Sequence, residues 1–72
     1  MPVEMLIVGG GSIGERHLRC FQQIGCAVAL CEKHSEKRQE LVERYKLDGA
    51  FTSVEEAAEK NWYGVVICTP AH

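Results

Sequence analysis

The sequence predicts an α/β fold, a partial doubly wound parallel sheet whose elements follow the order βαβαβαβ and whose strands lie in the order 3-2-1-4. Four short apolar runs alternate with three segments of helical periodicity. The connections are short, which favours parallel strands joined by right-handed crossovers. A glycine-rich segment directly follows the first apolar run. No repeat, low-complexity segment or linker interrupts the 72 residues, so we expect one domain over residues 1–72.

The first strand is expected over residues 3–8, because this run is almost continuously apolar, the pattern of a strand buried on both faces. A helix is expected over residues 12–23, ended by Gly25 at its C′ position. A second apolar strand follows over residues 26–31. The residues expected on the buried face of the helix are Ile13, His17, Cys20, Phe21 and Ile24.

Ser35 is the expected N-cap of a second helix, with Glu36 well placed at the positive end of the helix dipole. An i,i+4 pair of opposite charges, Glu40 and Arg44, supports this helix. Its apolar face is supplied by Leu41, Val42 and Tyr45.

A short third strand is expected over residues 50–52. The S-x-x-E pattern that begins at Ser53 is a capping box and starts a third helix, which extends to about Lys60. The fourth strand is expected over residues 63–69, ended by Pro70. Trp62 and Tyr63 are expected to cover the core.

Residues 9–14, GGGSIG, fit the pattern G-x-G-x-x-G between the first strand and the first helix. In this context the pattern is the dinucleotide-binding fingerprint of a Rossmann βαβ unit. Gly9 permits the tight turn, Gly11 lets a phosphate approach the main chain, and Gly14 lets the helix pack closely on the sheet. A strand–helix turn without a ligand would need only one of these glycines. The N–H donors expected to meet a pyrophosphate at the helix N-terminus belong to Ser12 and Ile13.

Glu32 ends the second strand, 18 residues after Gly14. A carboxylate there can accept hydrogen bonds from both hydroxyls of the adenosine ribose, and its charge repels a 2′-phosphate. This favours NAD as the cofactor, although Lys33, His34 and Arg38 lie nearby and could tolerate NADP. Taken alone, a glutamate at a strand end would be an ordinary solvated side chain.

Thr69 and Pro70 end the strand that lies beside the first strand in the expected order, so they should line the cofactor crevice. Proline also ends strands that have no functional role. His17, on the expected buried face of the first helix, is interpreted as a packed histidine and not as a catalytic one.

The composition, with a net charge of −2, gives neither the basic field of a nucleic-acid-binding protein nor a polybasic membrane anchor. The apolar runs are too short to cross a bilayer. Residues 1–4 lack the features of a signal peptide, so we expect a cytoplasmic protein that begins at residue 1. The four cysteines contain no C-x-x-C pair, and we expect reduced core residues, not metal ligands or disulfides, at Cys20, Cys26, Cys31 and Cys68.

Nearly the whole chain resembles the N-terminal domain of the Gfo/Idh/MocA oxidoreductases. Three segments carry the resemblance: the fingerprint with His17 three residues after it, Leu30-Cys31-Glu32, and the strand that ends in Thr69-Pro70. The resemblance implies NAD(P)-dependent hydride transfer at a hydroxyl carbon of a sugar, a cyclitol or a similar small molecule. It implies that the cofactor is held by Gly9, Gly11, Ser12, Ile13, Gly14 and Glu32, and that Thr69, Pro70 and His72 line the crevice toward the nicotinamide.

In that family the catalytic lysine, in a Glu-Lys-Pro segment, and the substrate domain lie further along the chain. We therefore expect these residues to be the N-terminal part of an enzyme, inactive alone and with no catalytic residue of their own. The fourth strand would then present an unpaired apolar edge, through which we expect self-association or a homo-oligomer. A non-catalytic, NAD-binding regulatory module is the alternative, and an S-adenosylmethionine enzyme is a third hypothesis, against which Gly14 weighs.

Overall fold

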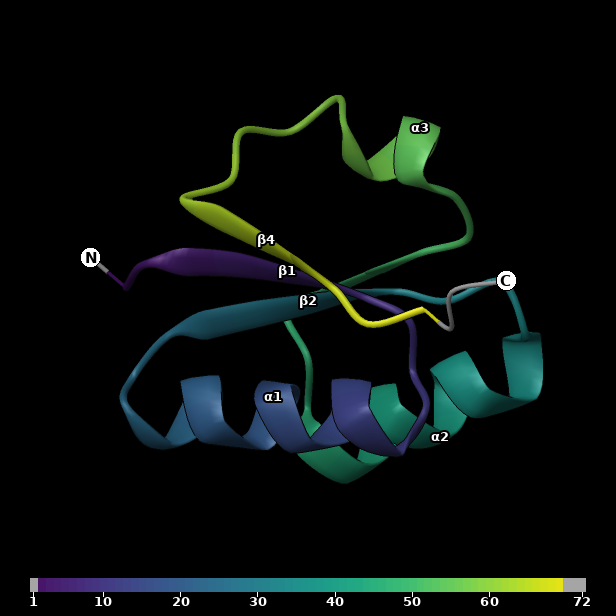
Figure 1. Ribbon diagram of the computed structural model, residues 1–72, viewed down its shortest axis with the longest axis horizontal. Helices are drawn as coiled ribbons and strands as arrows, with labels where there is room; N and C mark the ends of the chain where they lie inside the picture. The colour runs from purple at the N-terminus through teal and green to yellow at the C-terminus, as the bar shows by residue number, and fades with distance from the viewer. Residues whose placement is uncertain (1, 70–72) are drawn as a thin grey trace.

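Four parallel strands form one sheet in the order β3-β2-β1-β4, which confirms the predicted fold class and strand order. The computed structural model describes residues 2–69. Helices α1 and α2 cover one face of the sheet and α3 lies on the other (Figure 1). The elements are β1 (Glu4–Val8), α1 (Ser12–Gln23), β2 (Ala27–Cys31), α2 (Ser35–Tyr45), β3 (Gly49–Phe51), α3 (Val54–Ala57) and β4 (Gly64–Ile67).

The core consists of two clusters, one on each face of the sheet. Strands β1 and β2 contribute to both clusters because alternate side chains point to opposite faces. The prediction that the first strand is buried on both faces is confirmed, and β2 is buried in the same way. On the α1–α2 face the fully buried residues are Ile7, Leu18, Val28, Leu30 and Leu41. On the α3 face the buried residues are Leu6, Val8, Ala29, Cys31 and Ala57.

The register of the strands brings their carboxyl ends level. Val8 at the end of β1 pairs with Cys31 at the end of β2 and with Ile67 at the end of β4. The segments that follow these three strands therefore start at the same edge of the sheet, and a functional site can be assembled there from residues distant in sequence.

Helix α1 ends as predicted at Gly25, which has a φ of +92°. The N–H of Gly25 donates to the carbonyl of Gln22 at 3.0 Å, and the N–H of Cys26 donates to the carbonyl of Phe21 at 3.0 Å. These two bonds form a Schellman motif, which satisfies carbonyls that the helix leaves free.

The predicted buried face of α1 is confirmed for Phe21 and wrong for the other four residues, because the buried line is shifted by one residue. The line that packs on the sheet runs through Gly14 and Leu18 to the half-buried Phe21. His17 and Cys20 are exposed, and Ile13 and Ile24 are 62% and 75% exposed. A shift of one residue turns a helix face by about 100°, and the close packing of Gly14 on the loop decides which line faces the sheet.

Three local expectations about the second half of the chain also need correction. His34, not Ser35, is the N-cap of α2, and its side chain makes no cap bond. Helix α3 is a single turn that ends well before Lys60. Tyr63 is 81% exposed and covers no core.

Trp62 does cover the core, as expected. Its ring packs edge-on against Phe51, with ring centroids 5.9 Å apart, over the cluster on the α3 face. Its Nε1–H donates to the carbonyl of Ala57 at 2.9 Å. The capping box forms in part: the N–H of Glu56 donates to Ser53 Oγ at 3.2 Å, but the Glu56 carboxylate accepts from the N–H of Thr52 and not from the N-cap.

Helices α1 and α2 are joined by a polar cluster on the outside of the sheet. The carboxylate of Glu15 accepts a hydrogen bond from Arg44 at 2.7 Å and one from the Tyr45 hydroxyl at 2.5 Å. Arg44 also pairs with Glu40 at 3.6 Å, as the i,i+4 spacing predicts. These bonds from Tyr45 and Arg44 lower the pKa of Glu15.

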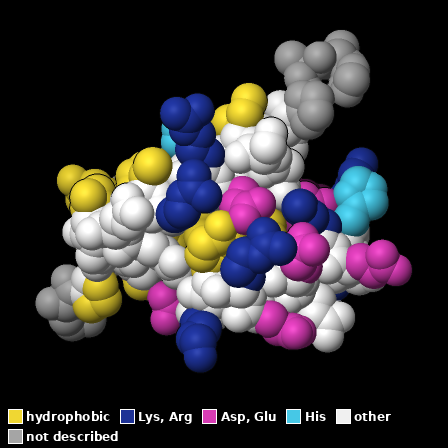
Figure 2. All heavy atoms as spheres, turned by 90° about the horizontal axis from the view of Figure 1, so that it is seen from below, with side chains coloured by type: hydrophobic (Ala, Val, Ile, Leu, Met, Phe, Trp, Pro, Cys, Tyr) yellow, Lys and Arg dark blue, Asp and Glu magenta, His cyan; other side chains and the backbone are white. Residues whose placement is uncertain are grey.

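The surface on the α1–α2 side carries Lys, Arg, Asp and Glu side chains interspersed over the helices (Figure 2). Positive and negative groups alternate over short distances there, so this face presents no extended field of one sign.

Within residues 2–69, no helix has both the length and the apolar character that a membrane span requires.

Candidate functional site

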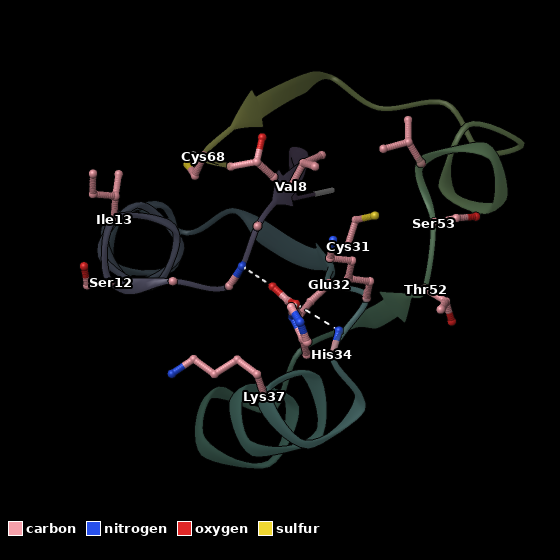
Figure 3. A pocket seen from close by; sticks show the side chains of 16 residues that line it. Val8, Ser12, Ile13, Cys31, Glu32, His34, Lys37, Thr52, Ser53 and Cys68 are labelled. Carbon is pink, nitrogen blue, oxygen red and sulfur yellow. Dashed lines mark hydrogen bonds and ion pairs between the residues drawn. The ribbon is translucent and has the colours of Figure 1, made fainter. Parts of the chain in front are cut away.

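A groove of about 1210 Å³ lies at the carboxyl ends of the strands (Figure 3). In a doubly wound sheet this edge, between strands whose connections run to opposite faces, is where ligands bind. The groove is lined by residues of four segments: Val8, Gly9, Gly10, Gly11, Ser12 and Ile13 from the end of β1 onward; Cys31, Glu32, Lys33, His34 and Lys37 from the end of β2 onward; Thr52, Ser53 and Val54 after β3; and Cys68 and Thr69 after β4.

Two glycines of the fingerprint are required by the backbone itself. Gly9 has a φ of +105°, and a Cβ there would meet the backbone of Cys68 at 3.0 Å and of Thr69 at 3.1 Å. A Cβ on Gly14 would overlap the carbonyl oxygen of Gly9. The start of α1 therefore lies directly on the turn, close to the end of β4.

Gly11 differs from these two because a Cβ there would meet no atom within 4 Å. It is the N-cap of α1, with no side-chain cap bond, and it is followed by the exposed first turn of Ser12 and Ile13. Main-chain donors at such a helix start, with open space in front of them, suit an anion. This open space at Gly11 is where the fingerprint places a pyrophosphate.

Gly10, to which the sequence analysis assigned no role, holds the key carboxylate of the groove. Its N–H donates to Glu32 Oε1 at 2.6 Å, which joins the loop after β1 to the end of β2. A Cβ at Gly10 would lie 3.0 Å from that same oxygen and 3.1 Å from Leu41 Cδ1. The run of three consecutive glycines was the signal for this constraint, since the G-x-G-x-x-G pattern leaves the middle residue free.

The carboxylate of Glu32 is largely enclosed, with its side chain 10% exposed. Its second oxygen, Oε2, accepts from the N–H of His34 at 2.9 Å and contacts His34 Nδ1 at 2.8 Å. Burial acts to raise the pKa of Glu32, but the bonds from His34 and from the N–H of Gly10 outweigh it, so that the pKa is lowered. Glu32 is therefore a carboxylate at neutral pH.

Basic side chains lie around this carboxylate on the α2 side. Lys33, His34 and Lys37 line the groove, and in Figure 3 the Lys37 side chain extends from α2 toward the side of the groove where Ser12 lies. Lys37 also pairs with Glu40 at 3.3 Å. Arg38 does not line the groove; it donates to the backbone carbonyl of Glu32 at 2.8 Å and so fixes the end of β2.

The structure brings most of the predicted site residues together. Gly9, Gly11, Ser12, Ile13, Glu32 and Thr69 line one groove, and Gly14 lies beneath it. Pro70 and His72 lie outside the described residues. Sequence reasoning missed the contributions of Gly10, Lys37 and the loop after β3, residues 52–54. The predicted strand order could have indicated that loop, because β3 lies beside β2 and ends at the same edge.

The cysteines differ from one another in their surroundings. Cys31 is buried, Cys26 and Cys68 are half-buried, and Cys20 is exposed on α1, against the expectation that all four belong to the core. Burial raises the pKa of the Cys31 and Cys68 thiols, which keeps them protonated at neutral pH.

No group of three His, Cys, Asp or Glu side chains that could hold a metal ion occurs in the part of the chain that the structure describes.

Comparison with known proteins adds a family to this geometry. A family model for the Gfo/Idh/MocA oxidoreductases, described as an NAD-binding Rossmann fold, matches residues 3–72. A search of curated proteins finds no match to the chain. The family match spans nearly the whole chain, and the fold, the glycine turn and the carboxylate at the end of β2 agree with it. The chain therefore belongs to the Gfo/Idh/MocA oxidoreductase family, as an NAD-binding domain with a Rossmann fold.

Proposed function

We propose that the groove binds the adenosine and pyrophosphate parts of NAD for an enzyme that oxidises or reduces a hydroxyl carbon of a sugar, a cyclitol or a similar small molecule. Residues 1–72 would be the N-terminal, NAD-binding part of that enzyme. The observation that carries the cofactor assignment is the enclosed Glu32 carboxylate, which the N–H of Gly10 holds 2.6 Å away at the edge of the glycine loop.

The glycine loop suits a pyrophosphate for steric and electrostatic reasons. The space in front of Gly11 is open, and the first turn of α1 offers the N–H groups of Ser12 and Ile13 to a negative charge. The turn that presents them is held by the contacts of Gly9 and Gly14. Ser12 and Ile13 would bind the phosphates through their main-chain N–H groups, so binding would not depend on a particular side chain.

Glu32 would accept hydrogen bonds from the adenosine ribose hydroxyls. Its lowered pKa keeps it negative at neutral pH, and a negative charge there repels the 2′-phosphate of NADP. The neighbouring Lys33 and Lys37 act in the opposite direction, because they bring positive charge to the same groove. We expect the carboxylate to dominate, since it is enclosed while Lys33 is exposed and Lys37 is paired with Glu40.

The nicotinamide, when bound, supplies the hydride chemistry; the residues of this chain bind and orient the dinucleotide. Thr69, which follows β4 at the same edge of the sheet, lines the groove. It would line the path toward the nicotinamide. The proton transfer that accompanies hydride transfer needs an acid or base within reach of the substrate hydroxyl, a role that we do not assign to the residues that line the groove.

The test is a titration of NAD⁺ and of NADP⁺ into the purified chain and its Glu32→Ser variant. We expect the parent to bind NAD⁺ more tightly, and the variant to lose about tenfold of that preference, or about 1.4 kcal/mol, because the repulsion of the 2′-phosphate is removed. The matched control is Glu36→Ser, which removes an exposed carboxylate from the first turn of α2 and should leave the preference unchanged. Tighter binding of NADP⁺ by the parent would contradict the assignment.

A further inference from the structure

The carboxylate of Glu32 is almost fully occupied by groups of the protein itself. Oε1 accepts from the N–H of Gly10, and Oε2 faces both the N–H and the Nδ1 of His34, at 2.9 and 2.8 Å. An ionised carboxylate offers about four acceptor positions. Three of them are thus taken in the protein, while an adenosine ribose would bring two hydroxyl donors to this residue.

One of the three donors must therefore leave when a ribose binds through both hydroxyls. The N–H groups of Gly10 and His34 belong to the main chain and cannot leave without moving the glycine loop or the start of α2. The His34 imidazole is 72% exposed, and rotation of its side chain alone would release Oε2. Figure 3 shows the His34 side chain beside that of Glu32, at the side of the groove from which α2 starts.

We propose that the His34 side chain is a reversible competitor of the dinucleotide: it occupies the acceptor position on Glu32 that a ribose hydroxyl needs, and it swings away when NAD binds. This inference rests on the proposed role of Glu32 in binding the ribose. It assigns to His34 control over the affinity for NAD, a role distinct from holding Glu32 in place.

The contact between His34 Nδ1 and Glu32 is made to an ionised group, because the pKa of Glu32 is lowered. A hydrogen bond to a charged carboxylate is stronger than one between neutral groups. A ribose hydroxyl must break this bond to take its place, so the contact is expected to weaken the binding of NAD.

Other charged groups also lie near the His34 side chain. Glu36, Lys37 and Glu40 of α2 share a small depression with His34, and Lys33 precedes it in the chain. Lys37 and Glu40 pair with each other, and Arg38 is bonded to the carbonyl of Glu32. Among the described residues, the loops after β1 and β3 bring only uncharged side chains to the groove, so the partner of His34 there is Glu32.

The experiment measures the Kd of NAD⁺ by calorimetry for the parent chain and for His34→Ala. The variant should bind NAD⁺ about two- to fivefold more tightly, the range that one exposed ion pair spans. The His34 side chain makes no cap bond to α2, so the helix should keep its start, which a circular dichroism spectrum checks. Lys33→Ala is the matched control: it removes a neighbouring cation that also lines the groove and should give no tightening.

A Glu32→Gln variant, measured in parallel, separates the proposed competition by His34 from the proposed role of Glu32 in binding the ribose. If Glu32→Gln weakens NAD⁺ binding while His34→Ala leaves it unchanged, the competition is wrong and the role of Glu32 stands. Weaker binding by His34→Ala would show that His34 orients Glu32, which also overturns the proposal. If Glu32→Gln has no effect, the proposed function fails and the inference fails with it.

A second measurement needs no variant. In the nitrogen-15 spectrum of the parent chain, the side-chain signals of His34 should shift on addition of NAD⁺, because the contact between Nδ1 and Glu32 breaks. The His17 side chain, exposed on the outside of α1, serves as the internal reference and should not shift. Unchanged His34 signals at saturating NAD⁺ would overturn the proposal.

Discussion

Gly14 lies directly against the carbonyl group of Gly9, so that a Cβ at residue 14 would overlap the carbonyl oxygen. This contact joins the first turn of α1 to the end of β1. It also sets the distance between the helix and the sheet, because Gly14 and Leu18 form the buried line of α1.

Gly14→Ala should destabilise the domain by about 2–4 kcal/mol, since the added methyl group must displace backbone in a well-packed region. Chemical denaturation followed by circular dichroism measures the free energy of unfolding. Gly11→Ala is the control: its Cβ would meet nothing within 4 Å and its φ of −72° is open to any residue. Equal stability of the two variants would show that the contact is not tight.

Gly11→Val tests the open space in front of the glycine loop, whereas Gly14→Ala tests close packing. The side chain enters open space, so the fold should be retained, but it occupies the position where a pyrophosphate would approach the main chain. We expect at least a hundredfold loss of NAD⁺ affinity, or about 2.7 kcal/mol, in calorimetry on a variant whose circular dichroism spectrum matches that of the parent. An unchanged affinity would place the pyrophosphate elsewhere.

The polar cluster between α1 and α2 predicts acid sensitivity. The hydrogen bonds from Tyr45 and Arg44 lower the pKa of Glu15 below its usual value of 4.5. A carboxyl group whose pKa is lower in the folded state stabilises the protein above its unfolded pKa, and this stabilisation is lost as the pH falls through the folded pKa. Stability should therefore begin to fall near pH 4.5 and continue to fall below it.

Glu15→Gln should flatten this part of the pH profile, in thermal unfolding measured from pH 7 to pH 3. Part of the acid sensitivity should remain, because the pKa of Glu32 is lowered as well. A profile as steep in Glu15→Gln as in the parent would mean that Glu15 has no share in it.

The exposed side chains of β4 predict self-association of the chain. Among the described residues β4 pairs only with β1, and Val65 and Ile67 are 50% and 64% exposed. Their register with Leu6 and Val8 places them on the α3 face, where the single turn of α3 covers little of the sheet. An apolar strand at a sheet edge is a template for pairing with another chain.

Sedimentation velocity at micromolar to high micromolar concentration measures this association. Val65→Lys should reduce it, because a charge on an edge strand opposes pairing. Ile24→Lys is the matched control, since it removes an even more exposed apolar side chain, one at the end of α1 and away from the sheet edge. A monomeric parent with cooperative thermal unfolding would contradict the prediction.

The elements that could be predicted from the sequence are those in which the hydrophobic pattern agrees with the packing of the folded chain. Strands β1 and β2 are apolar at successive positions because both their faces are buried, and the glycine pattern identified the turn between β1 and α1. The groove follows from these elements, because parallel strands of matched register end at one edge. Glu32 could be placed there from its position at the end of β2 alone.

What could not be predicted depends on atomic contacts. The helix face that runs through His17 is as regular in sequence as the one that runs through Leu18, and the close contact at Gly14 decides between them. Ser35 is a good N-cap by its residue type, yet His34 takes that position, where its side chain reaches Glu32. The bond between Gly10 and Glu32 joins residues 22 positions apart, and no local pattern contains it.

The chain contains a single tryptophan, whose fluorescence reports on only one face of the sheet. Trp62 packs against Phe51 and under the ammonium group of Lys60, 5.2 Å from its ring centroid, on the side of the sheet opposite α1 and α2. Its fluorescence therefore reports the opening of the α3 layer, whereas the far-ultraviolet circular dichroism signal is dominated by the two long helices. If the single turn of α3 detaches before the rest of the domain unfolds, the emission will change at a lower temperature than the ellipticity, and the chain will unfold in two separable stages.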